Sequence, residues 1–578
     1  MAAELAVCNS LLQLNHPKRE DHFFKWGIII YKKGGNDFLK NVNMKILLLN
    51  VGLIIILLPS FSQENTRIVF TINVNDTVQK IRNIGASACW FGEEIGKKWP
   101  AGEKQRMAEV LFSRAFEKNG QPKGIGLSAF RFNIGAGTAE QRDSSGIKDP
   151  AHRVECFLSP QGRYDWNKQQ GYTWLLQQAK KQGVKDLIAF VNSPPVQFTK
   201  NGLGYKLQKD EVSNLQENKY ADYAGFLSAV IRHFDKINCH FNYISPVNEP
   251  QWDWTGSFGE AKQEGSPWTN EEIYKTVKTL NSSLHQQKLT TKILITEAGM
   301  LNHLYDFNVK ASRQIARFWN PKSDLYIGNL SNTTPFVEGH GYFTDKDDET
   351  LVDVRKKLKD TLQKYNAGLE YWQSEYCMLG DGFKENITAV KRSAMDCALF
   401  LAKVIHHDFT TGNATAWHFW NAFEPGAADS NTRYYLVALN TAKNTDSSKL
   451  YSITKNLWAL GHYSLFVRPG MYRLQTSRSD GLSQTAAAQQ VMVSAFKDNK
   501  TLVVNVINYT IENTIAGFVL QALPNAKKMK LVKRYVTTAT AGEDMMPYPV
   551  ENTKEQKAGN TYDVIFPARS VTTLLFSF

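Results

Sequence analysis

Short apolar runs and amphipathic stretches alternate along the chain from residue 81 to about residue 460. The apolar runs have the length of buried strands, and the stretches between them repeat apolar residues at the spacing of helices. Eight strands are predicted in this way, at residues 84–90, 128–134, 187–192, 243–248, 293–297, 336–342, 370–375 and 414–420. Because strands that alternate with helices form parallel sheets, these units predict an α/β fold, a (β/α)8 TIM barrel over residues 81–462.

The pattern changes after Tyr463. Runs at residues 490–496, 502–508 and 571–578 alternate apolar and polar residues in the manner of half-buried strands. Residues 463–578 are therefore predicted to form an all-β sandwich domain attached to the barrel. An N-terminal strand is predicted within residues 63–80, and we expect it to pair with that β domain.

An apolar run near the start is typical of a secretory signal. Met44-Lys45 precedes the run at residues 46–58, and small residues suited to a signal peptidase follow it. We expect residues 44–62 to be a signal peptide, translation to begin at Met44, and residues 1–43 to be a misassigned extension. A single membrane anchor is the alternative, but the run is short for crossing a bilayer. The mature protein would be secreted or periplasmic, with no stable membrane span.

The composition is that of a globular protein. Hydrophobic residues make up 42% of the chain and charged residues 21%. Loss of residues 1–62 would remove seven basic and four acidic residues, which lowers the net charge from +13 to +10. Since no run of Lys and Arg is interleaved with aromatic residues, we expect no nucleic-acid partner.

The cysteines predict neither a disulfide framework nor a zinc site. Removal of Cys8 with the signal would leave an odd number, widely spaced at positions 89, 156, 239, 377 and 397. We expect no metal ion and no cofactor.

Two short segments place a glutamate directly after a predicted buried strand. They are Asn248-Glu249-Pro250 and Trp372-Gln373-Ser374-Glu375-Tyr376. Hydrolysis of a glycosidic bond needs a protonated carboxyl group at the leaving oxygen and an ionised carboxylate at the anomeric carbon. Reactive residues of (β/α)8 enzymes lie at the carboxyl ends of strands, where both glutamates fall. The pair indicates glycosidase chemistry; two surface glutamates in ion pairs are the alternative.

The residues at successive strand ends resemble those of glycoside hydrolase family 30, within the large clan of retaining (β/α)8 glycosidases. The resemblance extends over nearly the whole chain after the expected signal. Its motifs are Gly85-Ala86-Ser87 with Trp90, Arg131-Phe132-Asn133-Ile134-Gly135, Asn192-Ser193-Pro194-Pro195, Ser245-Pro246-Val247-Asn248-Glu249-Pro250, Thr296-Glu297-Ala298-Gly299, Gly339-His340-Gly341-Tyr342, Trp372-Gln373-Ser374-Glu375-Tyr376 and Trp417-His418-Phe419-Trp420. The Ser-Pro-Pro segment with Phe198-Thr199-Lys200-Asn201-Gly202 is most similar to the branch of endo-β-1,6-galactanases and related bacterial enzymes.

The resemblance implies roles for three of these residues. Glu249 corresponds to the general acid/base of the family and Glu375 to its nucleophile. A retaining enzyme holds two such carboxyl groups roughly 5 Å apart, so that one attacks the anomeric carbon while the other protonates the leaving oxygen. Asn248 corresponds to the residue that binds the sugar 2-hydroxyl.

Arg131 stands between two phenylalanines, where an unpaired cation would be costly. We expect Glu375 to be its partner, which would favour the ionised nucleophile. Tyr342 or His340 is expected to add a hydrogen bond to the same carboxylate. Ordinary structural pairing of these groups is the alternative.

Tryptophan rings can bury the C–H faces of pyranose rings while their N–H groups bind hydroxyls. We expect Trp90 and Trp420 to do so, and Trp252 and Trp254 remain open between substrate binding and core packing. Glu297 ends the fifth predicted strand and has either a contact with sugar hydroxyls or a structural role.

One position departs from the family pattern. Related bacterial members often carry an Asp in the Gly-Ala-Ser segment before the tryptophan, where this chain has Ala88. An Asp there would bind hydroxyls of the sugar being cleaved, so its absence leaves the identity of that sugar open.

We therefore expect a secreted retaining β-glycosidase that acts on an oligo- or polysaccharide, with endo-β-1,6-galactanase-like activity. Activity on β-1,6-glucan, xylan or glucosylceramide stays open, as does a catalytically silent carbohydrate-binding protein on the same scaffold. The presence of both glutamates with Asn248 and Arg131 favours the enzyme. The choice between endo and exo cleavage and the oligomeric state stay open too.

Overall fold

The computed structural model of the protein describes residues 67–380, 392–440, 450–521, 529–550, 554–555 and 561–577. The expected signal peptide and the extension before it lie outside these residues. Within the described part of the chain, no helix is both long and apolar enough to cross a membrane.

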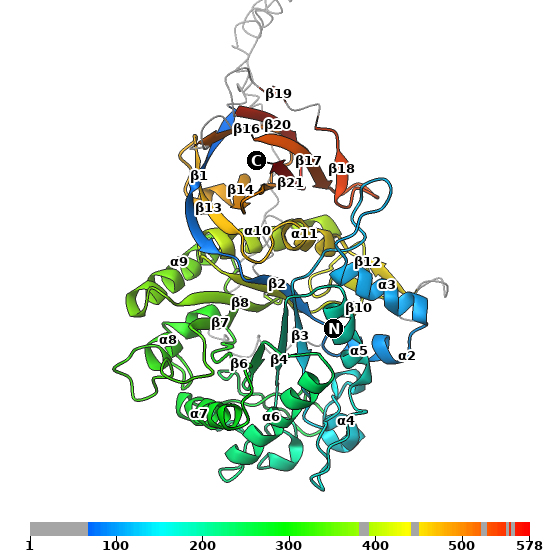
Figure 1. Cartoon of the computed structure of the whole chain (residues 1–578), viewed down its shortest axis with the longest axis vertical. Coiled ribbons are helices and arrows are strands. Elements are labelled where there is room, and N and C mark those ends of the chain that lie inside the picture. The colour runs from blue at the N-terminus through cyan, green and yellow to red at the C-terminus, as the bar shows by residue number, and fades with distance from the viewer. Residues whose placement is uncertain are drawn as a thin grey trace, which may run out of the picture. The chain divides into compact units, whose positions relative to one another are not determined.

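Eight parallel strands form the barrel (Figure 1). They are β2 (Asn83–Ser87), β3 (Ala129–Asn133), β4 (Asp186–Phe190), β5 (Tyr243–Ser245), β6 (Lys292–Ile293), β7 (Phe336–His340), β8 (Glu370–Tyr376) and β9 (Ala416–Phe419). Neighbours follow the order β6-β5-β4-β3-β2-β9-β8-β7, and isolated bridges from Ile293 to Thr333 and from Ala298 to Gly339 join β6 to β7. The predicted (β/α)8 fold is confirmed.

Helices surround these strands (Figure 1). They are α2 (Phe91–Lys98), α3 (Ala101–Phe112), α4 (Thr138–Gln141), α5 (Gln170–Lys181), α6 (Tyr220–Lys236), α7 (Asn270–Gln286), α8 (Gln314–Phe318), α9 (Asp348–Tyr365), α10 (Ala394–Thr410) and α11 (Lys455–Ser464). Local sequence sets where two of them begin: Thr269 and Ser393 form capping boxes at the starts of α7 and α10, which satisfy backbone N–H groups that have no partner inside the helix. A small sheet of β10 (Phe423–Pro425), β11 (Val437–Leu439) and β12 (Tyr451–Ile453) follows the last barrel strand.

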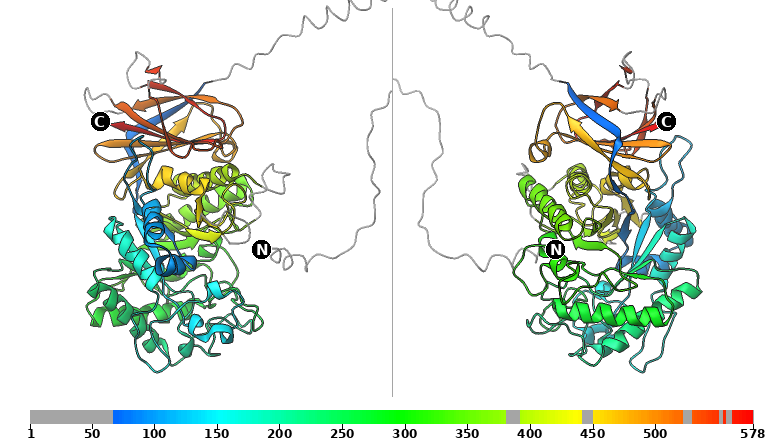
Figure 2. Two further views of the ribbon diagram at one scale, coloured as in Figure 1. Left: turned by 90° about the vertical axis from the view of Figure 1, so that its right-hand side faces the viewer. Right: turned by 60° about the vertical axis from the view of Figure 1, so that its left-hand side comes forward.

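The second domain is a ten-stranded sheet with a hydrophobic core of its own. It consists of β1 (Ile68–Lys80), β13 (Tyr472–Arg478), β14 (Val491–Lys497), β15 (Thr501–Asn508), β16 (Thr514–Gln521), β17 (Lys530–Thr537), β18 (Met546–Tyr548), β19 (Lys554–Glu555), β20 (Thr561–Phe566) and β21 (Ser570–Ser577), with the short helix α12 (Gln484–Ala487) between β13 and β14. β1 lies inside this sheet, antiparallel to β13 and parallel to β16. The pairing expected of the N-terminal strand is therefore present, and the right-hand view of Figure 2 shows this blue strand continuing from the β sheet into the barrel.

Two helices of the barrel pack against the β domain. Fifteen of the seventeen residues of α10 are buried, because α10 contacts β14, β15 and β21 as well as its barrel neighbours. On α11, the buried His462 hydrogen-bonds Thr573 of β21 at 2.8 Å and Thr537 of β17 at 2.9 Å, one from each ring nitrogen. Both bonds would be lost if the domains separated.

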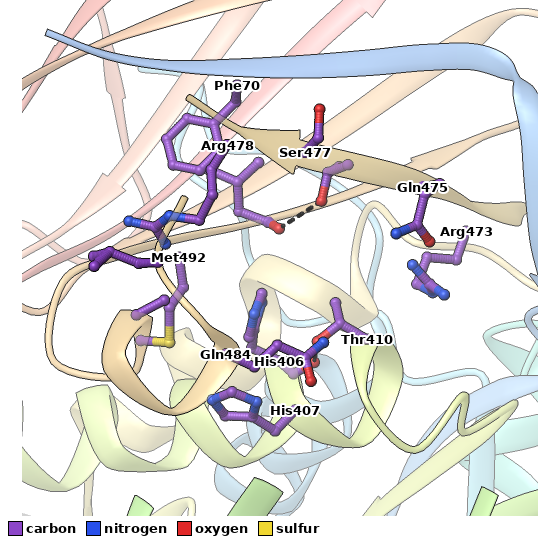
Figure 3. Close-up of a pocket in the computed structure, with 14 residues that line it drawn as sticks. Phe70, His406, His407, Thr410, Arg473, Gln475, Ser477, Arg478, Gln484 and Met492 are labelled. Atoms are coloured by element: carbon purple, nitrogen blue, oxygen red, sulfur yellow. Dashed lines mark hydrogen bonds between the residues drawn. The ribbon is translucent and has the colours of Figure 1, made fainter. Parts of the chain in front are cut away.

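A polar pocket also lies between the domains (Figure 3). His406 and His407 of α10 line it from one side together with Gln484, and Arg473 and Arg478 line it from the side of the β domain. Burial, together with the two arginines, lowers the pKa of His406 to about 3. The His406 ring on the α10 side of the pocket is therefore neutral and adds no positive charge next to the two arginines.

The shared interface predicts that the barrel does not fold alone. A chain of residues 67–461 would leave β1 without β13 and β16 and would expose the buried face of α10. We expect such a chain to aggregate or to melt well below the full protein. Soluble monomer with near-native melting and turnover, measured by size-exclusion chromatography and calorimetry, would show that the domains are independent.

Candidate active site

The candidate residues gather at the carboxyl ends of the barrel strands. The tightest group comes from the four neighbouring strands β5 to β8 and from β3: it consists of Glu249 after β5, Glu297 after β6, His340 on β7, Glu375 on β8 and Arg131 on β3. All five side chains are at least nine-tenths buried. They form one hydrogen-bonded cluster of three carboxyl groups and two cationic groups.

The backbone around this cluster is strained. Non-glycine residues with positive φ include Trp90 (45°), Glu249 (43°), Trp254 (49°), Glu297 (33°) and Phe343 (59°). Left-handed backbone at such residues costs roughly 1–3 kcal/mol each, and it concentrates at functional sites. The turns after β2, β5, β6 and β7 thus hold their side chains in place at an energetic cost.

Gly341 shows why the segment His340-Gly341-Tyr342 needs a glycine. A Cβ at this position would lie 2.2 Å from Nε2 of Gln373 and 3.0 Å from the ring of Tyr376. The close approach of β7 to β8 brings the flanking His340 and Tyr342 within reach of Glu375.

Glu249 and Glu375 have carboxyl groups close enough for a retaining mechanism. One oxygen of each, together with a ring nitrogen of His340, lies within 4.8 Å of the others. Retaining glycosidases hold their carboxyl groups about 5 Å apart, whereas inverting enzymes leave about 6.5–9.5 Å for a water molecule.

Glu375 is surrounded by donors. Arg131 donates from Nη1 to one carboxylate oxygen, and the Tyr342 hydroxyl donates to the other at 3.0 Å. His340 Nδ1 lies 3.6 Å from the same oxygen as Tyr342. The partner expected for Arg131 is therefore the observed one, and these donors stabilise negative charge on Glu375.

Glu249 lies in a different environment. Burial raises the pKa of its carboxyl group, and the hydrogen bond and positive charge of His340 counteract that rise only in part. His340 Nδ1 is 2.8 Å from Oε1 of Glu249. Of the two glutamates, Glu249 has the surroundings of a proton donor.

Glu297 is the anion that balances the two cationic groups. Its Oε1 accepts from Arg131 at 3.2 Å and from Ser245 at 2.6 Å, and its Oε2 lies 3.0 Å from His340 Nε2 and accepts from Ser374 at 2.7 Å. Burial alone would raise the pKa of Glu297, but Arg131 and His340 hold it far below its usual value. Two roles were open for Glu297, a contact with sugar hydroxyls and a structural role. Because its side chain is fully buried and both carboxylate oxygens accept hydrogen bonds, the structural role applies.

His340 connects all three carboxyl groups. Burial alone would lower the pKa of its ring, but Glu375, Glu249 and Glu297 raise it to about 10. Both ring nitrogens face carboxylate oxygens, so the ring is a doubly protonated imidazolium at neutral pH. Glu249, His340 and Glu375 have the spacing of metal ligands, but both ring nitrogens of His340 face carboxylate oxygens, as hydrogen-bond donors would.

Asn248 presents an unpaired acceptor beside these groups. Its Nδ2 donates to Asn192 at 3.1 Å, while Oδ1 of Asn248 and Nδ2 of Asn192 are buried without a hydrogen-bond partner. Unsatisfied buried polar atoms at a cleft are suited to bind substrate hydroxyls. Asn192 was part of a recognised motif, but its role appears only in the structure.

The tryptophans divide into two groups. Trp90 is 8% exposed and stacks on His152 at 4.0 Å, with its ring edge-on to Trp420 at 5.3 Å. Trp420 keeps a partly exposed ring. Trp252 and Trp254 follow β5 instead and are half-buried. The indole N–H of Trp254 donates to the backbone carbonyl of Glu249.

Ala88 is buried, and its Cβ would lie 2.9 Å from a Cβ placed on Gly92 of α2. The position thus packs against a helix, and no acidic side chain reaches the site from it.

Comparison with known proteins places the chain among carbohydrate-degrading enzymes. Residues 67–432 match the model of O-glycosyl hydrolase family 30. The chain is 23% identical over 496 residues to an endo-β-1,6-galactanase of Hypocrea rufa, covering 82% of this chain and 90% of that protein. It is 24% identical over 390 residues to a glucuronoxylanase of Bacillus subtilis (strain 168), covering 65% and 70%.

Solved structures agree on the fold. A conserved exported protein from Bacteroides fragilis is 32% identical, with a TM-score of 0.78 over 88% of this chain and 100% of that one. The catalytic domain of a xylanase from Talaromyces cellulolyticus gives a TM-score of 0.60 at 19% identity, over 88% of this chain and 100% of that domain.

The fold and these matches define an enzyme that hydrolyses glycosidic bonds. The chain belongs to glycoside hydrolase family 30.

The balance of charge around Glu297 generates a prediction. Glu297→Gln leaves two buried cationic groups with one fewer anion, and we expect a loss of about 3 kcal/mol or more in the free energy of unfolding, measured with denaturant. The pKa of His340 should also fall. In the wild type, the stability contributed by protonated His340 is complete below pH about 6.5 and is lost as the pH rises toward 10. In the variant, the lower pKa of His340 should bring this loss to completion at a lower pH.

Glu370→Gln is the matched control, because Glu370 pairs with Arg82 while both side chains stay partly exposed. Its loss should remain below about 1 kcal/mol. Equal losses in the two variants would contradict the special position of Glu297.

Proposed function

We propose that the protein is a secreted, retaining β-glycosidase that cleaves β-1,6-linked galactan by double displacement, with Glu249 as acid/base and Glu375 as nucleophile. The observation that carries the mechanism is the pair of buried carboxyl groups within 4.8 Å of each other, of which Glu375 accepts from Arg131 and Tyr342 and Glu249 has a pKa raised by burial. Two carboxyl groups held apart in protonation state are the requirement for this reaction.

In the first step, Glu249 gives its proton to the leaving oxygen while Glu375 attacks the anomeric carbon. His340 donates to Oε1 of Glu249, which favours the acid proton on Oε2. As the bond to the leaving group breaks, the electron pair goes to the protonated oxygen and a glycosyl ester forms on Glu375. Asn248 Oδ1 is placed to accept a hydrogen bond from the sugar 2-hydroxyl.

In the second step, Glu249 is a carboxylate and takes a proton from water. The water oxygen attacks the anomeric carbon and releases Glu375. Arg131 and Tyr342 stabilise the departing carboxylate with the same donors that hold it before reaction. Two inversions at one carbon return the β configuration.

The similarity to the galactanase of Hypocrea rufa supports galactan as the substrate, because the match extends over 90% of that protein. The bacterial glucuronoxylanase favours xylan as the second candidate, although it covers a smaller share of this chain. Secretion is supported by the similarity to an exported protein from Bacteroides fragilis and by the apolar run after Met44.

Hydrolysis of a glycan panel tests the activity. We expect the protein to release oligosaccharides from β-1,6-galactan, and Glu375→Gln to abolish release while the protein stays folded, since an amide cannot form the ester. The panel includes xylan, β-1,6-glucan and glucosylceramide, and chromatography of the products is the measurement. A preference for xylan would favour the second candidate, and inactivity on every glycan would favour a silent binding protein.

The stereochemistry of the first product tests the mechanism separately from the substrate. The carboxyl spacing predicts that the β anomer appears first, before mutarotation. Proton NMR during hydrolysis of the best substrate of the panel is the measurement. Initial release of the α anomer would mean an inverting enzyme and would exclude Glu375 as nucleophile.

A further inference from the structure

Aromatic rings line the β5–β7 side of the site, away from Trp90 and Trp420. Trp252, after β5, packs edge-on against His303 at 5.7 Å and against Phe343 at 6.1 Å. Phe307 packs on the far side of His303 at 4.8 Å. We call these four residues the aromatic wall.

The wall keeps large apolar surfaces in solvent. Phe343 is 45% exposed and Phe307 is 42% exposed. Phe343 also has a φ of 59°, a conformation that is costly for a bulky residue. A strained backbone that holds an exposed aromatic ring next to a reactive centre is a feature of binding sites rather than of core packing.

The wall is connected to the acid through Trp252, whose backbone N–H donates to the carbonyl of Glu249 at 3.2 Å. The carboxyl group of Glu249 must meet the oxygen of the leaving group. The order of strands places β5 and β6 across the barrel from β2 and β9, which carry Trp90 and Trp420. A glycan that crosses the site would therefore meet aromatic rings on both sides of the bond to be cleaved.

We propose that the aromatic wall binds the pyranose ring of the leaving group, so that the enzyme cleaves within a glycan chain. This inference rests on the proposed function. Polar groups among the rings suit a sugar: burial lowers the pKa of His303 to about 4, and its neutral ring has an unpartnered Nδ1. Asp253, beside Trp252 in sequence, forms an ion pair with Lys209 at 2.8 Å. Rings interrupted by polar groups match the alternating C–H and hydroxyl surface of a sugar.

A glycosyl fluoride tests the wall, because fluoride replaces the leaving sugar and has no ring to stack. The polymer that the wild type cleaves fastest is compared with the β-glycosyl fluoride of the same sugar. For Phe343→Ala, we expect the ratio of kcat/KM on the polymer to kcat/KM on the fluoride to fall roughly five- to tenfold, the size of one lost aromatic contact. Phe307→Ala should lower the same ratio by a smaller factor.

Phe116→Ala is the control, since Phe116 is 37% exposed and stacks on Tyr535 of the β domain rather than on a residue of the site. Its ratio should equal that of the wild type. If Phe343→Ala and Phe307→Ala lower turnover of both substrates equally, or of neither, the wall does not bind the leaving group. If the wild type cleaves neither substrate, the proposed function itself is wrong. Turnover of the fluoride shows that each variant is folded.

Discussion

The buried carboxylate of Glu297 is the interaction on which the rest of the site depends. It neutralises Arg131 and His340, the two groups that in turn position Glu375 and Glu249. Burying a cation without a partner costs several kcal/mol, so neither could stay charged at full burial without a nearby anion. The cluster is therefore one unit in which Glu249 and Glu375, the groups that we propose react, are energetically coupled to the groups that hold them.

This coupling explains how two glutamates less than 5 Å apart take different roles. Arg131 and Tyr342 both donate to Glu375, whereas Glu249 receives one donor from a histidine that it shares with the other carboxylates. Burial then raises the pKa of Glu249. The nearby carboxylate of Glu375 raises the pKa of Glu249 further, because two like charges repel each other. The different surroundings of the proposed acid and the proposed nucleophile arise from the whole network rather than from either residue.

Much of this arrangement could be predicted from the sequence. Buried parallel strands are short, and both of their faces are buried, as in β3 and β4, so their number and order could be predicted from the alternation of short apolar runs with helical stretches. The pairing of Arg131 with an acidic group follows from its apolar neighbours. The pairing of β1 with the C-terminal domain could also be predicted, because buried and less buried positions alternate along β1 as in a half-buried strand.

The role of Glu297 could not be predicted in the same way. Its strand, β6, has only two residues, and the chain then turns through a φ of 33° at Glu297 itself. Alternation along a strand indicates which face a side chain takes, but a residue in left-handed backbone after the strand does not follow that alternation. The side chain points inward to meet Arg131 and His340, while Phe343, after β7 with a similar φ, keeps its ring in solvent. Left-handed backbone after a strand thus directs these two side chains differently. Glu297 joins the buried charge network, and Phe343 stays exposed, where we propose that it binds a sugar.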